Sequence, residues 1–493
     1  MTKSVFCDNI WLRREKGFVM IGRQREKEII LDCAQADRSR LIVVYGRRRV
    51  GKTFLVREAF DYTFTFTHTG IEDGTYDEQL SGFWRSIRQQ LDDNCPRPGN
   101  WAEAFDLLGR ALAASKDRRK AVFIDELPWM DTRNSGFVKA ISSFWNGWAN
   151  ARKDVVMVVC GSAAAWMTRK ILQNRGGLFN RANRTIYLEP FTLNECEQFL
   201  ESEGIVMNRR DIVCAYMIFG GAPYYWSLLD RRESLSQNID RLFFSPNAEL
   251  AGEFKRLYKS VFNNPEPYID IVTALATKKI GMTRDELLKS IPDAGSNGAF
   301  SENLANLETS GFIRRYVETG NVKKGSVFQL IDNYTLFYFK FIRNYGGRDA
   351  NRWSHLANDQ SRVVWEGLAF ERVCLQHAMQ IKKALGVSGV ATNESSWRSV
   401  AKSSDGKGAQ IDLVIERGDR VTNLCEMKFS SDEYAIGSDE AERLRGKVAA
   451  FRRETGTRNA CHLTFVTTYG LLRNKNSCLV QSQVTMDDLF AAL

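Results

Sequence analysis

The feature that most constrains this chain is a loop, closed at each end by glycine, that follows a short apolar run. Residues 41–45 are Leu-Ile-Val-Val-Tyr, which predicts a buried strand, and residues 54–60 predict a helix. The segment between them has the spacing Gly-x-x-x-x-Gly-Lys-Thr, which is typical of phosphate-binding loops. Its residues are Gly46, Arg47, Arg48, Arg49, Val50, Gly51, Lys52 and Thr53.

Each part of this loop has a physical role in holding a nucleoside triphosphate. Gly46 and Gly51 allow positive φ angles and let the backbone come close to phosphate oxygens. The loop amides and the positive end of the following helix attract the anion. Lys52 is expected to reach the β- and γ-phosphates, and Thr53 to place its hydroxyl on Mg²⁺. The expected cofactors are therefore ATP and Mg²⁺.

A second motif follows downstream, where residues 121–124 are apolar and end in the pair Asp125 and Glu126. This is the Walker B pattern, in which a buried strand fixes a carboxylate at its carboxyl end. Asp125 is expected to hold the Mg²⁺ shell, and Glu126 to orient and deprotonate the attacking water. The alternative is a strand that meets an ordinary acidic turn.

Two further residues are candidates for the same site. Residues 154–162 predict another buried strand, and Ser162 at its end is a candidate sensor of the γ-phosphate. Arg181 precedes an expected strand at residues 185–188 and is a candidate transition-state arginine, acting in cis or from a neighbouring subunit. A solvated arginine is the alternative for Arg181.

The order of these motifs resembles the archaeal-type ATPase family, an AAA+/STAND relative among P-loop NTPases. The resemblance covers about residues 18–230 and adds two elements, Gly22-Arg23 before the loop and Gly-Gly-Ala-Pro at residues 220–223. It implies that Gly22 and Arg23 pack beside the adenine. It also implies that Pro223 lies near the nucleotide in a helical lid.

Residues 263–345 predict three helices and a β-hairpin, which is the pattern of a winged helix. Ser301, Asn303 and Asn306 are expected on a helix that faces a nucleic-acid groove, and Lys323 and Lys324 at the hairpin tip on phosphates. An inert packing module is the alternative. An aromatic-rich helix over residues 332–342 is expected to be core.

The last part of the chain carries a separate set of charged residues. Residues 363–374 predict a helix that includes Glu371, and two strands follow at residues 408–415 and 421–429. Glu426 and Lys428 share one strand face, and we expect the hairpin to return Asp412 to the same edge. Carboxylates in this arrangement hold a divalent metal that activates water.

This helix and hairpin resemble the PD-(D/E)XK nuclease fold over about residues 355–475. The resemblance implies that Glu371, Asp412 and Glu426 are metal ligands and that Lys428 is catalytic. A surface hairpin with solvated charges is the alternative.

Bulk composition is consistent with a nucleotide-dependent protein that acts on nucleic acid. The 493 residues carry a formal net charge of +10, which favours an anionic partner such as DNA. The ten cysteines and four histidines are scattered, and no run suits a secretory signal or a membrane span, so we expect a cytoplasmic protein.

The expected fold is α/β, with four parts. These are a P-loop NTPase (AAA+-like) core at 1–191, a helical lid at 192–262, a winged-helix domain and aromatic bridge at 263–345, and a PD-(D/E)XK-like α/β domain at 355–493. The expected function is an ATPase, forming a homo-oligomer if Arg181 acts in trans, coupled to a metal-dependent nuclease in defence or mobile-element biology. The alternative is an ATP-switched DNA-binding regulator or scaffold whose nuclease-like domain does not cleave.

Overall fold

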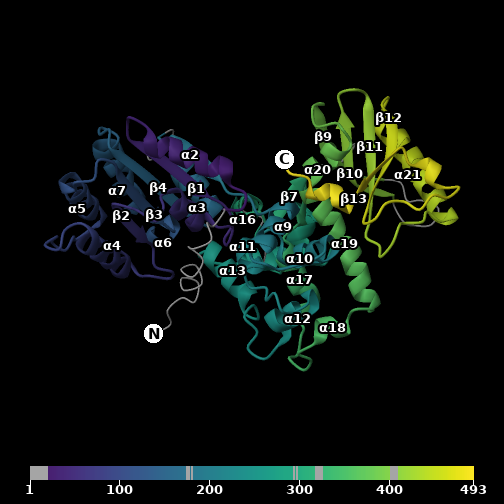
Figure 1. The fold of residues 1–493 in the computed structure, drawn as a ribbon, viewed down its shortest axis with the longest axis horizontal. Helices are drawn as coiled ribbons and strands as arrows, with labels where there is room; N and C mark the ends of the chain where they lie inside the picture. Colours follow the sequence, from purple (N-terminus) through teal and green to yellow (C-terminus); the bar gives the residue numbers. More distant parts are fainter. Residues whose placement is uncertain are drawn as a thin grey trace. The chain divides into compact units, whose positions relative to one another are not determined.

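The computed structural model describes residues 20–173, 178, 181–292, 295, 298–316, 326–399 and 409–493. These residues divide into two compact units (Figure 1). The first extends to Glu189 and includes Gln198–Ile205, and the second contains Pro190–Glu197 and Val206–Leu493. None of the described helices combines the length and apolar character needed to cross a membrane.

A parallel five-stranded sheet forms the centre of the first unit, in the order β2-β3-β4-β1-β5. Its central strands are buried along their length, which explains their unbroken apolar sequences. The expected α/β core with a parallel sheet is confirmed. The strands are β1 (Arg40–Tyr45), β2 (Phe66–Thr69), β3 (Lys120–Asp125), β4 (Val155–Gly161) and β5 (Arg184–Tyr187).

Helices cover both faces of this sheet. Leu41 and Val43 of β1 belong to one apolar core, and Ile42 and Val44 belong to the other. The first core contains residues of α4 (Tyr76–Gln90), α5 (Trp101–Ala114) and α7 (Phe137–Ser143), and the second contains residues of α2 (Gln24–Gln35) and α3 (Lys52–Ala59). Shorter helices are α6 (Leu127–Met130) and α8 (Ala164–Trp166).

The alternating Thr-Phe segment shows where periodicity overestimates a strand. Residues 62–67 alternate with period two, but the strand is Phe66–Thr69. Asp61 and Tyr62 have φ angles of 45° and 57°, so the chain is still turning after α3. Local backbone geometry therefore delays the strand.

The second unit begins with helices packed around aromatic side chains. Tyr334, Phe337 and Phe341 are buried, which agrees with the expectation that the aromatic helix is core. Phe341 contacts the rings of Trp353 and Trp365. The helices of this region are α10 (Arg209–Phe219), α11 (Pro223–Trp226), α12 (Leu235–Ile239), α13 (Glu253–Val261), α17 (Asn333–Phe337) and α18 (Arg352–His355), and α9 (Leu193–Ser202) spans the division between the units.

A small three-stranded sheet with strand order β6-β8-β7 follows the helical part. Thr283 and Glu286 form a capping box at the start of one of its helices. The predicted contacts of Lys323 and Lys324 lie outside the described residues. The elements are α14 (Glu266–Ala276), β6 (Met282–Thr283), α15 (Arg284–Ser290), α16 (Gly298–Thr309), β7 (Ile313–Tyr316) and β8 (Val327–Leu330).

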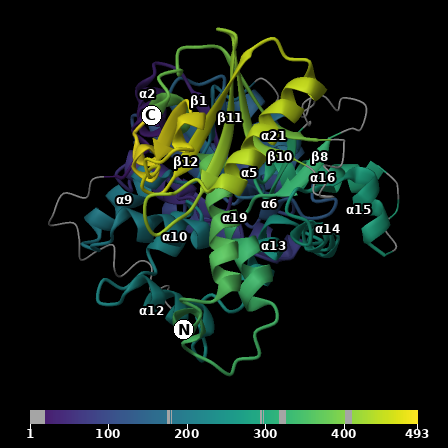
Figure 2. The ribbon, with the colours of Figure 1, turned by 90° about the vertical axis from the view of Figure 1, so that its right-hand side faces the viewer.

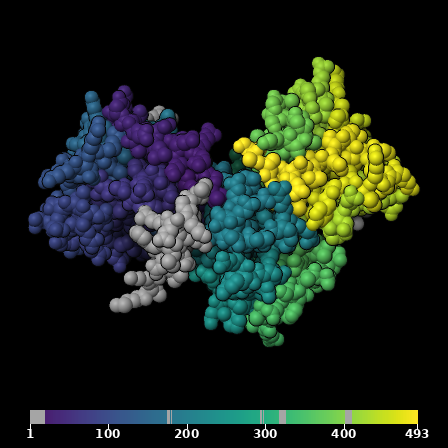
Figure 3. Space-filling view, viewed as in Figure 1, coloured from purple at the N-terminus to yellow at the C-terminus, as the bar shows by residue number. Residues whose placement is uncertain are grey.

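The carboxy-terminal part is a mixed five-stranded sheet in the order β13-β12-β11-β10-β9 (Figure 2). The pairs β9/β10 and β10/β11 are antiparallel, whereas β11/β12 and β12/β13 are parallel. The residues nearest the carboxy terminus, which are yellow in Figure 3, lie together on the surface of the second unit. The elements are α19 (Gln360–Gln376), α20 (Ala378–Ala384), β9 (Thr392–Arg398), β10 (Gln410–Arg417), β11 (Val421–Lys428), α21 (Ser438–Thr455), β12 (Ala460–Thr467) and β13 (Ser482–Thr485).

A buried histidine gives the second unit a testable dependence on pH. The Nδ1 of His377 donates to the carbonyl of Val373 at 2.8 Å, and its Nε2 accepts from the amide of Leu193 at 3.0 Å. Burial lowers the pKa of His377 to about 4. Protonation of Nε2 would point its new N–H at the Leu193 amide, which is itself a donor, so the folded protein favours the neutral form of His377.

We expect the stability of the second unit to fall as the pH drops from about 6.5, the pKa of an unfolded histidine, to about 4, because the unfolded chain then binds more protons. His377→Gln should flatten this dependence, since glutamine does not titrate. The measurement is the thermal unfolding midpoint followed between pH 4 and 8. Equal slopes for the variant and the parent would contradict the assignment to His377.

Candidate functional site

The glycine-bracketed loop joins β1 to α3, at the carboxyl end of the parallel sheet. Gly46, Arg49 and Gly51 have φ angles of 150°, 72° and 89°. A Cβ atom on Gly46 would lie 2.5 Å from the carbonyl oxygen of Leu188, so no larger residue fits there. A Cβ atom on Gly51 would meet no other atom, so the positive φ angle is the reason that glycine is favoured at this position.

Lys52 is the first residue of α3, and its ammonium group is enclosed by the loop. Its Nζ donates to the carbonyls of Gly46 at 3.2 Å and Arg47 at 2.8 Å. Burial lowers the pKa of Lys52, and the negative charges of Glu126 and Asp125 act in the opposite direction. A desolvated ammonium at the mouth of an amide-lined loop is suited to an anion with several oxygens, such as a triphosphate.

Asp125 ends β3 beside the start of α3. The Thr53 hydroxyl donates to its Oδ2 at 2.7 Å, and the amide of Glu126 donates to its Oδ1 at 2.9 Å. Burial, followed by the neighbouring Glu126 charge, raises the pKa of Asp125. A hydroxyl and a carboxylate in contact offer the hard oxygen ligands that Mg²⁺ prefers, so the pair Thr53 and Asp125 fits that cation.

Glu126 has a strained backbone and a fixed side chain. Its φ angle is 48°, which is uncommon for a residue other than glycine. The Ser162 amide and hydroxyl donate to the same oxygen, Oε2 of Glu126, at 3.1 and 2.8 Å. Ser162, predicted to sense the phosphate, therefore holds the carboxylate of Glu126, a role that needs the three-dimensional contact between β4 and the end of β3.

The Gly22-Arg23 element lies at the end of the sheet that carries the loop. Gly22 and Arg23 have φ angles of 59° and 62°, and the guanidinium of Arg23 donates to the carbonyl of Glu189. Arg48 of the loop forms an ion pair with Glu72 at 3.3 Å. Arg23 is therefore held at Glu189, just beyond the carboxyl end of β5, and adenine binding by Gly22 and Arg23 stays a prediction.

Arg181 lies at the opposite end of the sheet from the loop. The chain enters β5 beside the start of β1, where Asn183 bonds to Leu41 and Arg184 pairs with Ile42. Along parallel strands, the offset from Leu41 to the loop at Gly46 is roughly 15 Å. The prediction that Arg181 acts in cis is therefore wrong, because strand direction places it at the amino-terminal edge. Its role from a neighbouring subunit stays a prediction.

Pro223 begins α11 in the second unit, and its position near the nucleotide stays a prediction. The adjacent Gly221 has a local explanation. Its carbonyl accepts from the amide of Phe191, and a Cβ atom on Gly221 would lie 1.9 Å from the carbonyl oxygen of Phe191. The glycine in this motif is therefore required by backbone packing within the second unit.

The four predicted residues of the carboxy-terminal site separate into two groups. Glu371 and Asp412 lie in one pocket on the face of the sheet that α19 covers, where burial and then the charge of Asp412 raise the pKa of Glu371 to about 7. On the other side, Glu426 forms an ion pair with Lys447 of α21, and Lys428 forms one with Glu440 at 3.1 Å. In the described part of the chain, no three His, Cys, Asp or Glu side chains form a group that could hold a metal.

A β-bulge explains why Asp412 does not join Glu426. The register of β10 against β9 shifts by one residue between Ile411 and Val414, and both of these pack in the core beside α21. The extra residue turns Asp412 to the α19 face. Leu424 packs in the apolar core beside α21. Glu426 lies two residues after Leu424 on the same strand, so its side chain is on the same face of the sheet. The predicted shared metal is therefore not supported by the donor set.

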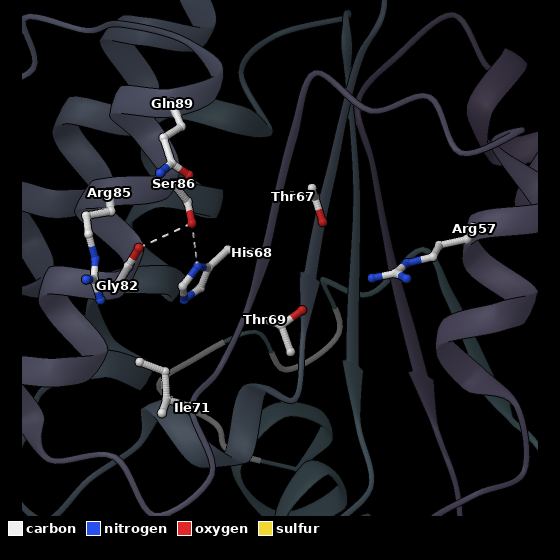
Figure 4. Close-up of a pocket in the computed structure, with 9 residues that line it drawn as sticks. All are labelled: Arg57, Thr67, His68, Thr69, Ile71, Gly82, Arg85, Ser86 and Gln89. Atoms are coloured by element: carbon white, nitrogen blue, oxygen red, sulfur yellow. Dashed lines mark hydrogen bonds between the residues drawn. The ribbon is translucent and has the colours of Figure 1, made fainter. Parts of the chain in front are cut away.

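A pocket that the sequence did not predict lies along the edge strand β2 (Figure 4). It measures about 400 Å³ and includes Arg57 of α3 and Arg85 of α4, which approach from different sides. His68 bonds to Ser86 at 2.9 Å, and burial lowers the pKa of this histidine to about 4. His68 is therefore neutral, and the two arginines provide the positive charge of this pocket.

Residues 20–229 match the family model described as an ATPase domain predominantly from Archaea. The chain is 23% identical over 428 residues to an uncharacterized protein of Methanocaldococcus jannaschii, covering 83% of this chain and 88% of that protein. The fold is similar to a Walker-type ATPase of Pyrococcus abyssi, with 16% identity, a TM-score of 0.47, and coverage of 66% and 96%. It is also similar to the Aeropyrum pernix ORC2 protein in its ADPNP–ADP complexes, with 13% identity, a TM-score of 0.39, and coverage of 74% and 97%.

Proposed function

We propose that this chain binds ATP at the loop Gly46–Thr53 and hydrolyses it. The observation that carries the proposal is the carboxylate of Glu126, which Ser162 fixes beside the Thr53–Asp125 pair and near the buried Lys52. The match of residues 20–229 to an ATPase domain supports the same function.

Each residue contributes a separate part of the reaction. Lys52 and the loop amides bind and orient the phosphates. Thr53 and Asp125 would hold Mg²⁺, which neutralises phosphate charge when it is bound. Glu126 accepts a proton from the attacking water, and Ser162 keeps the accepting carboxylate in place.

The experiment that tests this function is phosphate release from ATP by the full chain in the presence of Mg²⁺. We expect steady turnover that chelation of the metal abolishes. Absence of both binding and turnover in folded protein, with and without DNA, would overturn the proposal.

For the remainder of the chain we propose a DNA-binding role without cleavage, in which ATP acts as a switch. The arrangement of three helices and a three-stranded sheet supports a winged helix at residues 263–345. Ser301 accepts from Arg284, and Asn306 donates to Tyr268, so these two side chains have partners within this region. General positive charge is therefore the main support for DNA contact.

The carboxy-terminal sheet supports the PD-(D/E)XK likeness in its order of elements. Helix α19, antiparallel β9 to β11, helix α21 and parallel β12 follow one another along the chain. The separation of Asp412 from Glu426 favours the non-cleaving alternative over the nuclease. A homo-oligomer and a role in defence or mobile-element biology stay predictions.

We expect the protein to shift supercoiled plasmid in a gel without nicking it, with ATP and either Mg²⁺ or Mn²⁺ present. The physical reason is that two separated carboxylates provide too few shared oxygen ligands for one cation. The same plasmid assay is run on the parent and on three variants, Asp412→Ala, Glu426→Ala and Lys428→Ala. Metal-dependent nicking by the parent that all three variants lose would establish the nuclease instead.

A further inference from the structure

The second unit contains a pocket of about 320 Å³ on the α19 side of the carboxy-terminal sheet. We call it the α19 pocket, and residues from α14, β8, α17, α19 and β10 contribute to its wall. Its volume lies at the lower end of the range for small-ligand sites. The side chains that carry the argument are Lys279, Gln329, Trp365, Glu371, Arg372 and Asp412.

Two side chains in this wall carry buried donor atoms, three in all, that have no partner in the described part of the chain. The Nε and Nη2 atoms of Arg372 are buried without an acceptor, and so is the indole Nε1 of Trp365. Trp365 is 6% exposed. Burial lowers the pKa of Arg372 to about 10, which leaves the guanidinium charged at neutral pH. Buried unpaired donors are costly, and a ligand with several acceptors would satisfy them.

Hydrogen bonds also fix the polar wall of the pocket before any ligand binds. Arg314 donates to the amide oxygen of Gln329 at 2.7 Å, and the Gln329 amide nitrogen donates to the carbonyl of Lys279 at 2.7 Å. The Lys279 ammonium pairs with Glu371 at 2.7 Å. A wall with few alternative rotamers loses little entropy on binding, which favours affinity.

The balance of charge in the α19 pocket is positive. The wall contains two carboxyls, Glu371 and Asp412, and four cations, which are Lys278, Lys279, Lys340 and Arg372. Two of the cations are already paired, Lys278 with Glu286 and Lys279 with Glu371. Lys340 and Arg372 therefore remain against the single carboxyl of Asp412 among the wall residues. Apolar side chains such as Leu336 and Phe339 complete the wall. The ligand that suits these features has a compact anionic group and an apolar body.

We propose that the α19 pocket binds a phosphate monoester of mononucleotide size, with the phosphate on Arg372. The phosphate oxygens accept from the free guanidinium nitrogens, for which phosphate has matching geometry. The group is either a free mononucleotide or the 5′-phosphorylated end of a DNA strand. This site is separate from the ATP loop and does not depend on hydrolysis there.

The test is isothermal titration of full-length Lys52→Ala, in which the ATP loop is disabled, with three probes. The probes are dAMP, inorganic phosphate and a short oligonucleotide with or without a 5′-phosphate. We expect saturable binding of dAMP, and Arg372→Gln should weaken it by about tenfold or more, the cost of a charge-assisted hydrogen bond. A preference for dAMP identifies a free nucleotide, and a preference for the 5′-phosphorylated strand identifies a DNA end.

Two further variants keep the test decisive. Ala276→Phe adds a side chain to the pocket wall and should also block binding, even if Arg372→Gln fails to fold. Arg348→Gln removes an exposed arginine of the same unit and should leave the affinity unchanged. No binding of any probe, or binding that persists in both pocket variants, would overturn the proposal.

Discussion

Lys52→Ala is expected to reduce ATP affinity by about 100-fold or more, the combined value of two charge-assisted hydrogen bonds to phosphate, and to bring hydrolysis to background. The reason is that its Nζ is buried at the mouth of the loop, where the neighbouring groups are carbonyl oxygens and carboxylates. Affinity is measured by titration with a non-hydrolysable analogue, and turnover by phosphate release.

The matched control for this variant is Lys139→Ala, which removes an exposed lysine of α7 in the same unit. Its affinity and turnover should equal those of the parent. Thermal unfolding of Lys52→Ala beside the parent shows whether the variant is folded at the assay temperature. Undiminished turnover in folded Lys52→Ala protein would defeat the ATPase proposal.

Glu126→Gln is expected to leave ATP and Mg²⁺ bound while hydrolysis falls by about 10²- to 10⁴-fold, the usual contribution of a general base. Glutamine keeps the size of the side chain, and its amide oxygen still accepts from Ser162. The group that is lost is the carboxylate that takes the proton from water. Binding and single-turnover hydrolysis, measured on the same samples, separate the two effects.

Ser162→Ala provides the control for this assignment. It removes one of the two donors to Glu126 and leaves the backbone amide, so turnover should fall less than in Glu126→Gln. In the double variant Ser162→Ala should add no further loss, because the serine acts only through the carboxylate. A collapse of ATP affinity in Glu126→Gln would instead assign Glu126 to the metal or to the fold.

The geometry of the loop between β1 and α3 could be predicted from the sequence, since its motif is local. A strand, a loop with two glycines and a helix start follow one another in the chain, and the loop angles agree with the glycine positions. Asp125 follows four apolar residues and ends a strand that is buried throughout, so its placement at the carboxyl edge also follows from sequence. The parallel sheet brings the ends of β1 and β3 together without further information.

Contacts between residues far apart in the chain were decided only by the tertiary structure. Ser162 holds Glu126 because β4 lies beside β3, and the direction of β5 takes Arg181 away from the loop. In the last sheet, one extra residue in β10 turns Asp412 toward α19, whereas alternation along the sequence predicts that it faces Glu426. Local spacing fixes which side chains share an element, but strand register and direction fix which elements bring their side chains together.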